Sequence, residues 1–180
     1  MIFTETKLRG AYVIEPQTIN DERGFFARTW SVEEFSAERL NANLVQCNTS
    51  WNKQKGTVRG MHFQTPPHEE AKLIRCTAGA LYDVIVDLRR DSPTWGQWVG
   101  IELTRKNLRM IYVPEGFAHG FQTLAHGTDV FYQVSAYYHP ESARGVRWDD
   151  PTLAIDWPLP ISVISQRDQM LPFLEPRDKK

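Results

Sequence analysis

The stretch Leu81-Tyr-Asp-Val-Ile-Val-Asp-Leu88 alternates its side chains with a period of two. Its even-numbered positions are all apolar, and its odd-numbered positions carry Asp83 and Asp87 beside aliphatic residues. In a β-strand, successive side chains point to opposite faces of the sheet. The stretch therefore predicts a strand.

Similar short runs, rich in apolar and β-branched residues and broken by Gly, Pro, Asn and Asp, recur along most of the chain. This pattern favours an all-β sandwich or barrel. In the run 57–64, His62 falls on the face opposite to Arg59. In the run 131–138, Tyr132 and Tyr138 share one face, where both can line one cavity. A further strand is expected from Lys72 to Cys76, and turn signals lie at 65–67, 91–94 and 114–116.

Only one segment carries a good helix signal. Ser31-Val-Glu-Glu34 has the form of a capping box and predicts a short helix that continues over 35–40. From about residue 150 the chain is rich in proline, which predicts an irregular tail that wraps the domain. A length of 180 residues fits one domain, so residues 1–180 are expected to form a single one.

The composition excludes several classes of protein. With 41% hydrophobic and 24% charged residues, the chain has the make-up of an ordinary globular protein. Its 21 basic and 22 acidic residues give a net charge of −1 without a long run of one sign, which argues against a nucleic-acid partner. We expect no membrane span, no signal peptide and a cytoplasmic location. Cys47 and Cys76 are too few, and wrongly spaced, for a disulfide framework or zinc ribbon.

Polar and ionisable residues interrupt strand faces that are otherwise apolar, as at His62, Lys72, His119 and Tyr132. Burying such groups costs free energy unless each is paired. A barrel that lines its interior with them is best interpreted as one that holds a binding cavity.

The segment Pro114-Glu-Gly-Phe-Ala-His-Gly-Phe121 resembles the P-x-G-x-x-H strand signature of the cupin superfamily of small β-barrels. In many cupins that histidine binds a metal together with an H-x-H pair. Here His62 is followed by Phe63 and Gln64, so the H-x-H pair is missing. A metal-dependent cupin therefore remains only a rival hypothesis, with His62 as the one reasonable second ligand beside His119.

Taken together, a series of segments resembles one cupin family, the dTDP-4-dehydrorhamnose 3,5-epimerases, from about Lys7 to Pro172. The fold that this resemblance implies is a cupin-type jelly-roll β-barrel with a few short helices. The matching stretches are 21–26, 46–50, 59–64, 72–75, 83–89, 92–94, 114–121, 138–140, 148–150 and 165–168.

The family's catalytic roles carry over onto matching residues of this chain. The resemblance implies that His62 is the general base, Asp168 its orienting carboxylate, Tyr132 the general acid on the opposite face and Lys72 the stabiliser of the enolate oxygen. The chemistry requires such a set, because a C4 ketone acidifies the hydrogens at C3 and C5 and leaves negative charge on its oxygen. Neither a cofactor nor a metal is implied.

The resemblance also implies a set of substrate-binding residues and a homodimer. Arg23 and Arg59 suit a diphosphate, because a guanidinium offers paired donors to phosphate oxygens. The full set of expected substrate-binding residues is Arg23, Gln46, Asn48, Arg59, His119, Tyr138 and Arg167.

Some positions depart from the family's pattern. Arg28 and Ala143 stand where glutamates are common, Glu70 replaces a common Gln, and Arg167 replaces a common Lys. Because these two glutamates are absent, the identity of the nucleotide base stays open, with deoxythymidine favoured over cytidine or guanosine.

The expected activity is inversion of C3 and C5 of a dTDP-4-keto-6-deoxyhexose on the way to rhamnose or a related surface sugar. An epimerase acting on one carbon, or on a CDP- or GDP-linked sugar, is an alternative. A noncatalytic sugar-binding barrel is a more distant one, which would not need His62 paired with Asp168.

Overall fold

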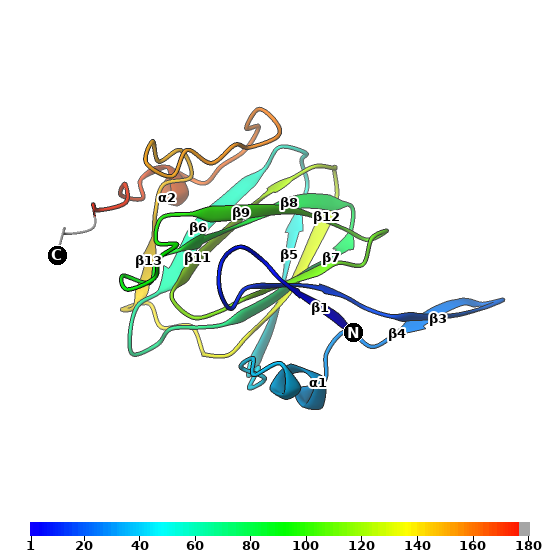
Figure 1. Ribbon diagram of the computed structural model, residues 1–180. Coiled ribbons are helices and arrows are strands. Elements are labelled where there is room, and N and C mark those ends of the chain that lie inside the picture. Colours follow the sequence, from blue (N-terminus) through cyan, green and yellow to red (C-terminus); the bar gives the residue numbers. More distant parts are fainter. Residues whose placement is uncertain (177–180) are drawn as a thin grey trace.

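The computed structural model describes residues 1–176, and its main feature is a pair of antiparallel sheets that face each other (Figure 1). The first sheet has six strands in the order β1-β2-β10-β7-β12-β5. Its strands are β1 (Ile2–Glu5), β2 (Tyr12–Glu15), β10 (Met110–Val113), β7 (Lys72–Ala78), β12 (Thr128–Val134) and β5 (Gln46–Asn52).

The second sheet has five strands in the order β13-β6-β11-β8-β9. Its strands are β13 (Ala143–Gly145), β6 (Val58–Gln64), β11 (Phe117–Thr123), β8 (Ala80–Asp87) and β9 (Trp98–Thr104). A separate hairpin of β3 (Thr18–Asp21) and β4 (Gly24–Ala27) extends away from both sheets (Figure 1). Within residues 1–176, no helix is long and apolar enough to cross a membrane.

The space between the two sheets is divided into an apolar part and a polar part. Side chains at alternating positions of both sheets, such as Ile74 on β7 and Ile85 on β8, are fully buried in one core cluster. On the same inward faces, Lys72, His119 and Tyr132 line a cavity instead. The all-β architecture predicted from the alternation is confirmed, and the interruptions of that alternation mark the cavity.

The outer face of each sheet is covered by a different segment. Helix α1 (Val32–Ala37) buries Phe35 against the outer face of the six-stranded sheet. The C-terminal tail packs Val146 and Leu153 against Met61 on the outer face of the five-stranded sheet. This tail contains the short helix α2 (Gln166–Gln169), which lies beside β6 (Figure 1). The path of the tail is otherwise largely irregular.

Two local expectations are wrong in detail. Ser31 is the N-cap of α1, but its side chain makes no capping hydrogen bond. The predicted capping partner, Glu34, instead pairs with the amino group of Met1 and with Arg28. Strand β12 ends at Val134, so Tyr138 reaches the cavity from the following loop rather than from the strand.

The alternation along β6 breaks at Gly60, and this break places Arg59 and His62 on one side. Strand β11 pairs His119 with His62 and Phe121 with Arg59, so two residues of β6 stand opposite one of β11. Such a bulge shifts the side-chain alternation by one position. Arg59 therefore lines the same cavity as His62, contrary to the face predicted from strict alternation.

Close contact between β6 and β11 at the bulge requires glycine. Gly60 has a φ of +123°, and a Cβ added there would lie 2.5 Å from the Cα of Gly120. Gly24, at the end of the β3–β4 hairpin, has a similar φ of +131° but has no atom within 4 Å of such a Cβ. Substituting Gly24 therefore tests backbone strain alone, whereas substituting Gly60 tests backbone strain together with steric overlap.

We expect Gly24→Ala to cost only the strain of a left-handed backbone, about 1–3 kcal/mol. Gly60→Ala adds the overlap with Gly120 and should cost at least about 3 kcal/mol more, or roughly 6–12 °C in Tm for a chain of this size. Thermal unfolding of both variants tests this. Equal losses in Tm would contradict the account of the bulge.

Candidate active site

A cavity of about 610 Å³ opens between the two sheets beside the apolar core. Every site residue predicted from the sequence lines it, with the exception of Arg23. Strands of both sheets supply the walls, and the C-terminal tail closes one side with Arg167 and Asp168. The predicted residues that the fold brings together here are Gln46, Asn48, Arg59, His62, Lys72, His119, Tyr132, Tyr138, Arg167 and Asp168.

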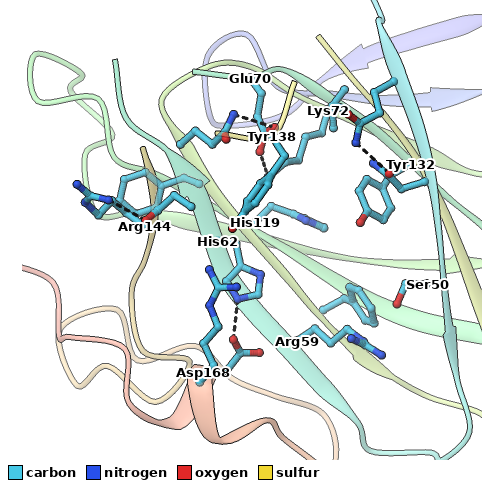
Figure 2. A pocket seen from close by; sticks show the side chains of 18 of the residues that line it. Ser50, Arg59, His62, Glu70, Lys72, His119, Tyr132, Tyr138, Arg144 and Asp168 are labelled. Carbon is cyan, nitrogen blue, oxygen red and sulfur yellow. Dashed lines mark hydrogen bonds and ion pairs between the residues drawn. The ribbon is translucent and has the colours of Figure 1, made fainter. Parts of the chain in front are cut away.

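A hydrogen bond joins His62 to Asp168 across 106 positions of sequence (Figure 2). The Nε2 atom of His62 lies 2.7 Å from Oδ1 of Asp168. When Nε2 carries the proton, it donates to the carboxylate and leaves the lone pair on Nδ1. Nδ1 has no hydrogen-bond partner within the described residues, so it is available to take a proton from a bound molecule.

Helix α2 holds Asp168 in place. Ser165 is its N-cap, and the Ser165 side chain accepts a hydrogen bond from the backbone N–H of Asp168 at 3.0 Å. The carboxylate is buried and also accepts the backbone N–H of Gly60 at 3.3 Å. Burial alone would raise the pKa of Asp168, but the bonds from His62 and Gly60 outweigh it and lower the pKa. Asp168 is therefore ionised at neutral pH, as an orienting carboxylate must be.

A second histidine, His119, lies opposite His62 in the pairing of β11 with β6. Its Nε2 atom lies 2.9 Å from Oδ2 of Asp83, which is fully buried. Burial raises the pKa of Asp83 against the opposing effect of His119. Within residues 1–176, the pocket histidines form no group of three metal-ligating side chains, which a metal-dependent cupin would need.

Lys72 and Tyr132 face His62 from the opposite sheet (Figure 2). The Nζ atom of Lys72 lies 2.9 Å from Oε1 of Glu70, and both side chains are largely buried. Burial raises the pKa of Tyr132, and the charge of Glu70 raises it further, while Arg59 acts in the other direction. The phenol is therefore protonated at neutral pH and can donate a proton.

Strand β5 supplies a polar wall through one of its faces. Gln46, Asn48 and Ser50 alternate along it and line the cavity, and Gln46 donates to Asn48 at 3.0 Å. Arg59 of β6 donates a 2.7 Å hydrogen bond from its Nε to Oδ1 of Asn52, which lies on β5. Ser50 was missed as a site residue, although the period of two extends directly from Asn48 to it.

Glu70 and Arg144 also line the cavity and were not predicted as site residues. Glu70 differs from the family's common Gln, and that departure was the one available signal for it. Arg144 lies on the short strand β13, for which no alternation was recognised.

Arg23 lies outside the cavity of its own chain. It is at the turn of the β3–β4 hairpin, where its highly exposed guanidinium pairs with Asp21. Of the two departures from expected glutamates, Arg28 pairs with Glu34 outside the cavity, whereas Ala143 lines it.

The sequence model of the dTDP-4-dehydrorhamnose 3,5-epimerase family matches residues 5–176. The chain belongs to this family. A relative with that name from Sinorhizobium fredii is 43% identical over 175 residues, which cover 97% of this chain and 90% of the relative.

Solved structures of the epimerase family share the fold. The Bacillus anthracis epimerase with TDP and PPi bound is 43% identical and has a TM-score of 0.93, covering 96% of this chain and 99% of that one. A 3′-monoepimerase from Streptomyces bikiniensis in complex with dTDP-quinovose is 30% identical, with a TM-score of 0.87 over 93% of this chain and 85% of that one. The expected cupin-type jelly roll is thus confirmed.

Asp168→Asn should reveal how much the His62–Asp168 hydrogen bond contributes to the stability of the fold. A carboxyl whose pKa is lowered by folding stabilises the folded state above its unfolded pKa of about 3.9 and loses that effect as the pH falls through its folded pKa. We therefore expect Asp168→Asn to lower the free energy of unfolding by about 1–2 kcal/mol at pH 7, since His62 is partly exposed and screened.

The difference between the two proteins should shrink as the pH falls below about 4. Urea unfolding of both proteins across this range measures it. A difference that stays constant down to pH 3 would show that the charge of Asp168 contributes nothing.

Proposed function

We propose that this chain inverts C3 and C5 of a dTDP-4-keto-6-deoxyhexose by proton abstraction and reprotonation. The observation that carries the proposal is the His62–Asp168 pair, which faces Tyr132 and Lys72 across one cavity. Inversion of a carbon needs a base on one face and an acid on the other. His62 and Tyr132 come from opposite sheets, which supports assigning one to each face.

In the proposed reaction, Nδ1 of His62 removes the proton from the carbon next to the C4 ketone. The electron pair of that C–H bond moves toward the C4 oxygen and forms an enolate. Lys72, whose ammonium group is buried beside Glu70, stabilises the negative charge on that oxygen. Tyr132 then donates its proton to the opposite face of the same carbon, which completes the inversion.

After one inversion, His62 carries the substrate's proton and Tyr132 has lost its own. Both groups must exchange protons with water before the second carbon reacts. His62 is 42% exposed on its side chain, which supports such exchange. The proton that each carbon receives therefore comes from solvent.

Inversion of a single carbon is the second candidate. It is favoured by the likeness to the Streptomyces bikiniensis 3′-monoepimerase. The same residues serve either outcome, because the shape of the cavity decides which carbon is presented to them. Deoxythymidine is the proposed base, supported by the TDP bound in the Bacillus anthracis relative. A single domain and a cytoplasmic location stay predictions.

We further propose a homodimer in which Arg23 binds the substrate held by the partner. The resemblance assigns Arg23 to substrate binding, yet Arg23 does not line the cavity of its own chain. Its hairpin extends away from both sheets (Figure 1). Ile19 and Phe26 on that hairpin are 70% and 67% exposed, and large exposed apolar side chains favour contact with another surface.

His62→Asn should abolish turnover while leaving binding intact. Removing the base lowers kcat by several orders of magnitude, because abstraction is lost, and dTDP affinity should change less than about threefold. Steady-state kinetic assays measure kcat, and isothermal titration calorimetry measures the affinity for dTDP. Unchanged turnover would contradict the assignment of His62 and favour a noncatalytic sugar-binding barrel.

Tyr132→Phe provides the contrasting variant. With the base intact and the acid removed, deuterium from solvent should still enter the substrate without inversion, whereas His62→Asn should permit neither. Loss of both processes in Tyr132→Phe would indicate that Tyr132 only packs the cavity.

Mixed dimers test the placement of Arg23. Arg23→Ala alone should raise KM, and a dimer of one Arg23→Ala chain with one His62→Asn chain should recover the wild-type KM at about half the activity. In that dimer, one site has His62 from the first chain and Arg23 from the second. Co-expression with two tags isolates it, and a KM that stays raised would place Arg23 in its own chain's site.

A further inference from the structure

Two loops at one side of the cavity carry a cluster of side chains that the proposed reaction does not use. His68 lies between β6 and β7, and His139 and Glu141 lie between β12 and β13. The ligating atoms of these three residues all lie within 4.8 Å of one another. They come from segments about 70 residues apart, so the fold brings them together.

The geometry converges on a single carboxylate oxygen. Oε1 of Glu141 lies 3.0 Å from Nδ1 of His139 and 3.9 Å from Nδ1 of His68. With metal–ligand distances of about 2.0–2.1 Å, neighbouring ligands of a tetrahedral zinc ion lie about 3.3 Å apart. The two observed distances fall on either side of that value.

The imidazole rings of His68 and His139 stack with centroids 3.5 Å apart and planes inclined by 6°. Parallel rings do not aim their lone pairs at one point, so one ring must turn to chelate an ion. The side chains are 31% and 36% exposed, which leaves room for that turn. His68 would give up its 2.8 Å hydrogen bond with Ser142 in doing so.

We propose that His68, His139 and Glu141 bind a divalent transition-metal ion of the zinc class. Two imidazoles and one carboxylate are a ligand set that Zn²⁺ uses, with water in the fourth position. Mg²⁺ and Ca²⁺ prefer sets made of oxygen alone. The ion links the two loops and takes no part in the proton transfers at His62.

The site connects to the cavity through Gln64. Its side-chain amide donates to the carbonyl of His68 at 2.8 Å and accepts the backbone N–H of His139 at 2.6 Å. Gln64 lines the cavity, as do Glu70 and Tyr138 from the two joined loops (Figure 2). Metal binding would therefore stiffen one rim of the substrate cavity.

Titration of chelator-stripped protein with ZnCl₂, followed by calorimetry, tests the site. We expect the wild type to bind one equivalent of Zn²⁺. In Glu141→Gln and in His139→Asn, the affinity for Zn²⁺ should fall at least about 100-fold, because losing even the hydrogen-bond partner of a metal ligand lowers metal affinity 10–100-fold. Glu141 is 64% exposed, so Glu141→Gln should fold normally. His126→Asn, in a different turn, is the matched control and should bind as the wild type does.

Hydrogen exchange provides a second readout. Zn²⁺ should slow amide exchange in residues 65–71 and 137–142 of the wild type but not of Glu141→Gln. Equal Zn²⁺ affinity in the wild type and Glu141→Gln would overturn the proposal. So would an equal loss of affinity in His126→Asn.

Discussion

The hydrogen bond between His62 and Asp168 is the contact on which the rest of the site depends. It forms only when the C-terminal tail crosses the outer face of the five-stranded sheet, where Val146 and Leu153 are buried against Met61. Gly60 then donates its backbone N–H to the same carboxylate. Burial of apolar side chains on the outer face of this sheet thus positions the Asp168 carboxylate at the cavity on its inner face. The same contacts therefore serve both the stability of the fold and the geometry of the site.

The cavity can hold ionisable side chains because several of them are paired, although within the described residues Oδ1 of the buried Asp83 has no hydrogen-bond partner. Lys72 pairs with Glu70, His119 with Asp83, and Arg59 with Asn52. Unpaired, these groups would cost several kcal/mol each in an interior of low dielectric constant. The partners also set protonation. Burial and Glu70 keep Tyr132 protonated, whereas hydrogen bonds keep Asp168 ionised, so a protonated phenol and an ionised carboxylate coexist in one space.

Alternation of side chains predicted the strands and the inward placement of Lys72 and Tyr132, because a pleated strand imposes that period. It failed at Arg59, since the bulge at Gly60 arises from pairing with a strand 60 residues later, which local pattern does not encode. Asp168 was found only through resemblance to the family, as no local feature connects it to His62. The helix start at Ser165 was not predicted either, and nothing in the local sequence indicates what the Asp168 carboxylate contacts. Arg23 was assigned by the same resemblance and lies outside the cavity of its own chain.

Proton NMR in deuterium oxide can follow the proposed inversion of both carbons and show whether it needs a metal ion. The purified protein is incubated with dTDP-4-keto-6-deoxyglucose, with and without a chelator, and the C3 and C5 hydrogens are followed. Both signals should disappear as solvent deuterium replaces them, with the chelator as well as without it. Exchange at neither carbon, or exchange that stops when the chelator is added, would contradict it.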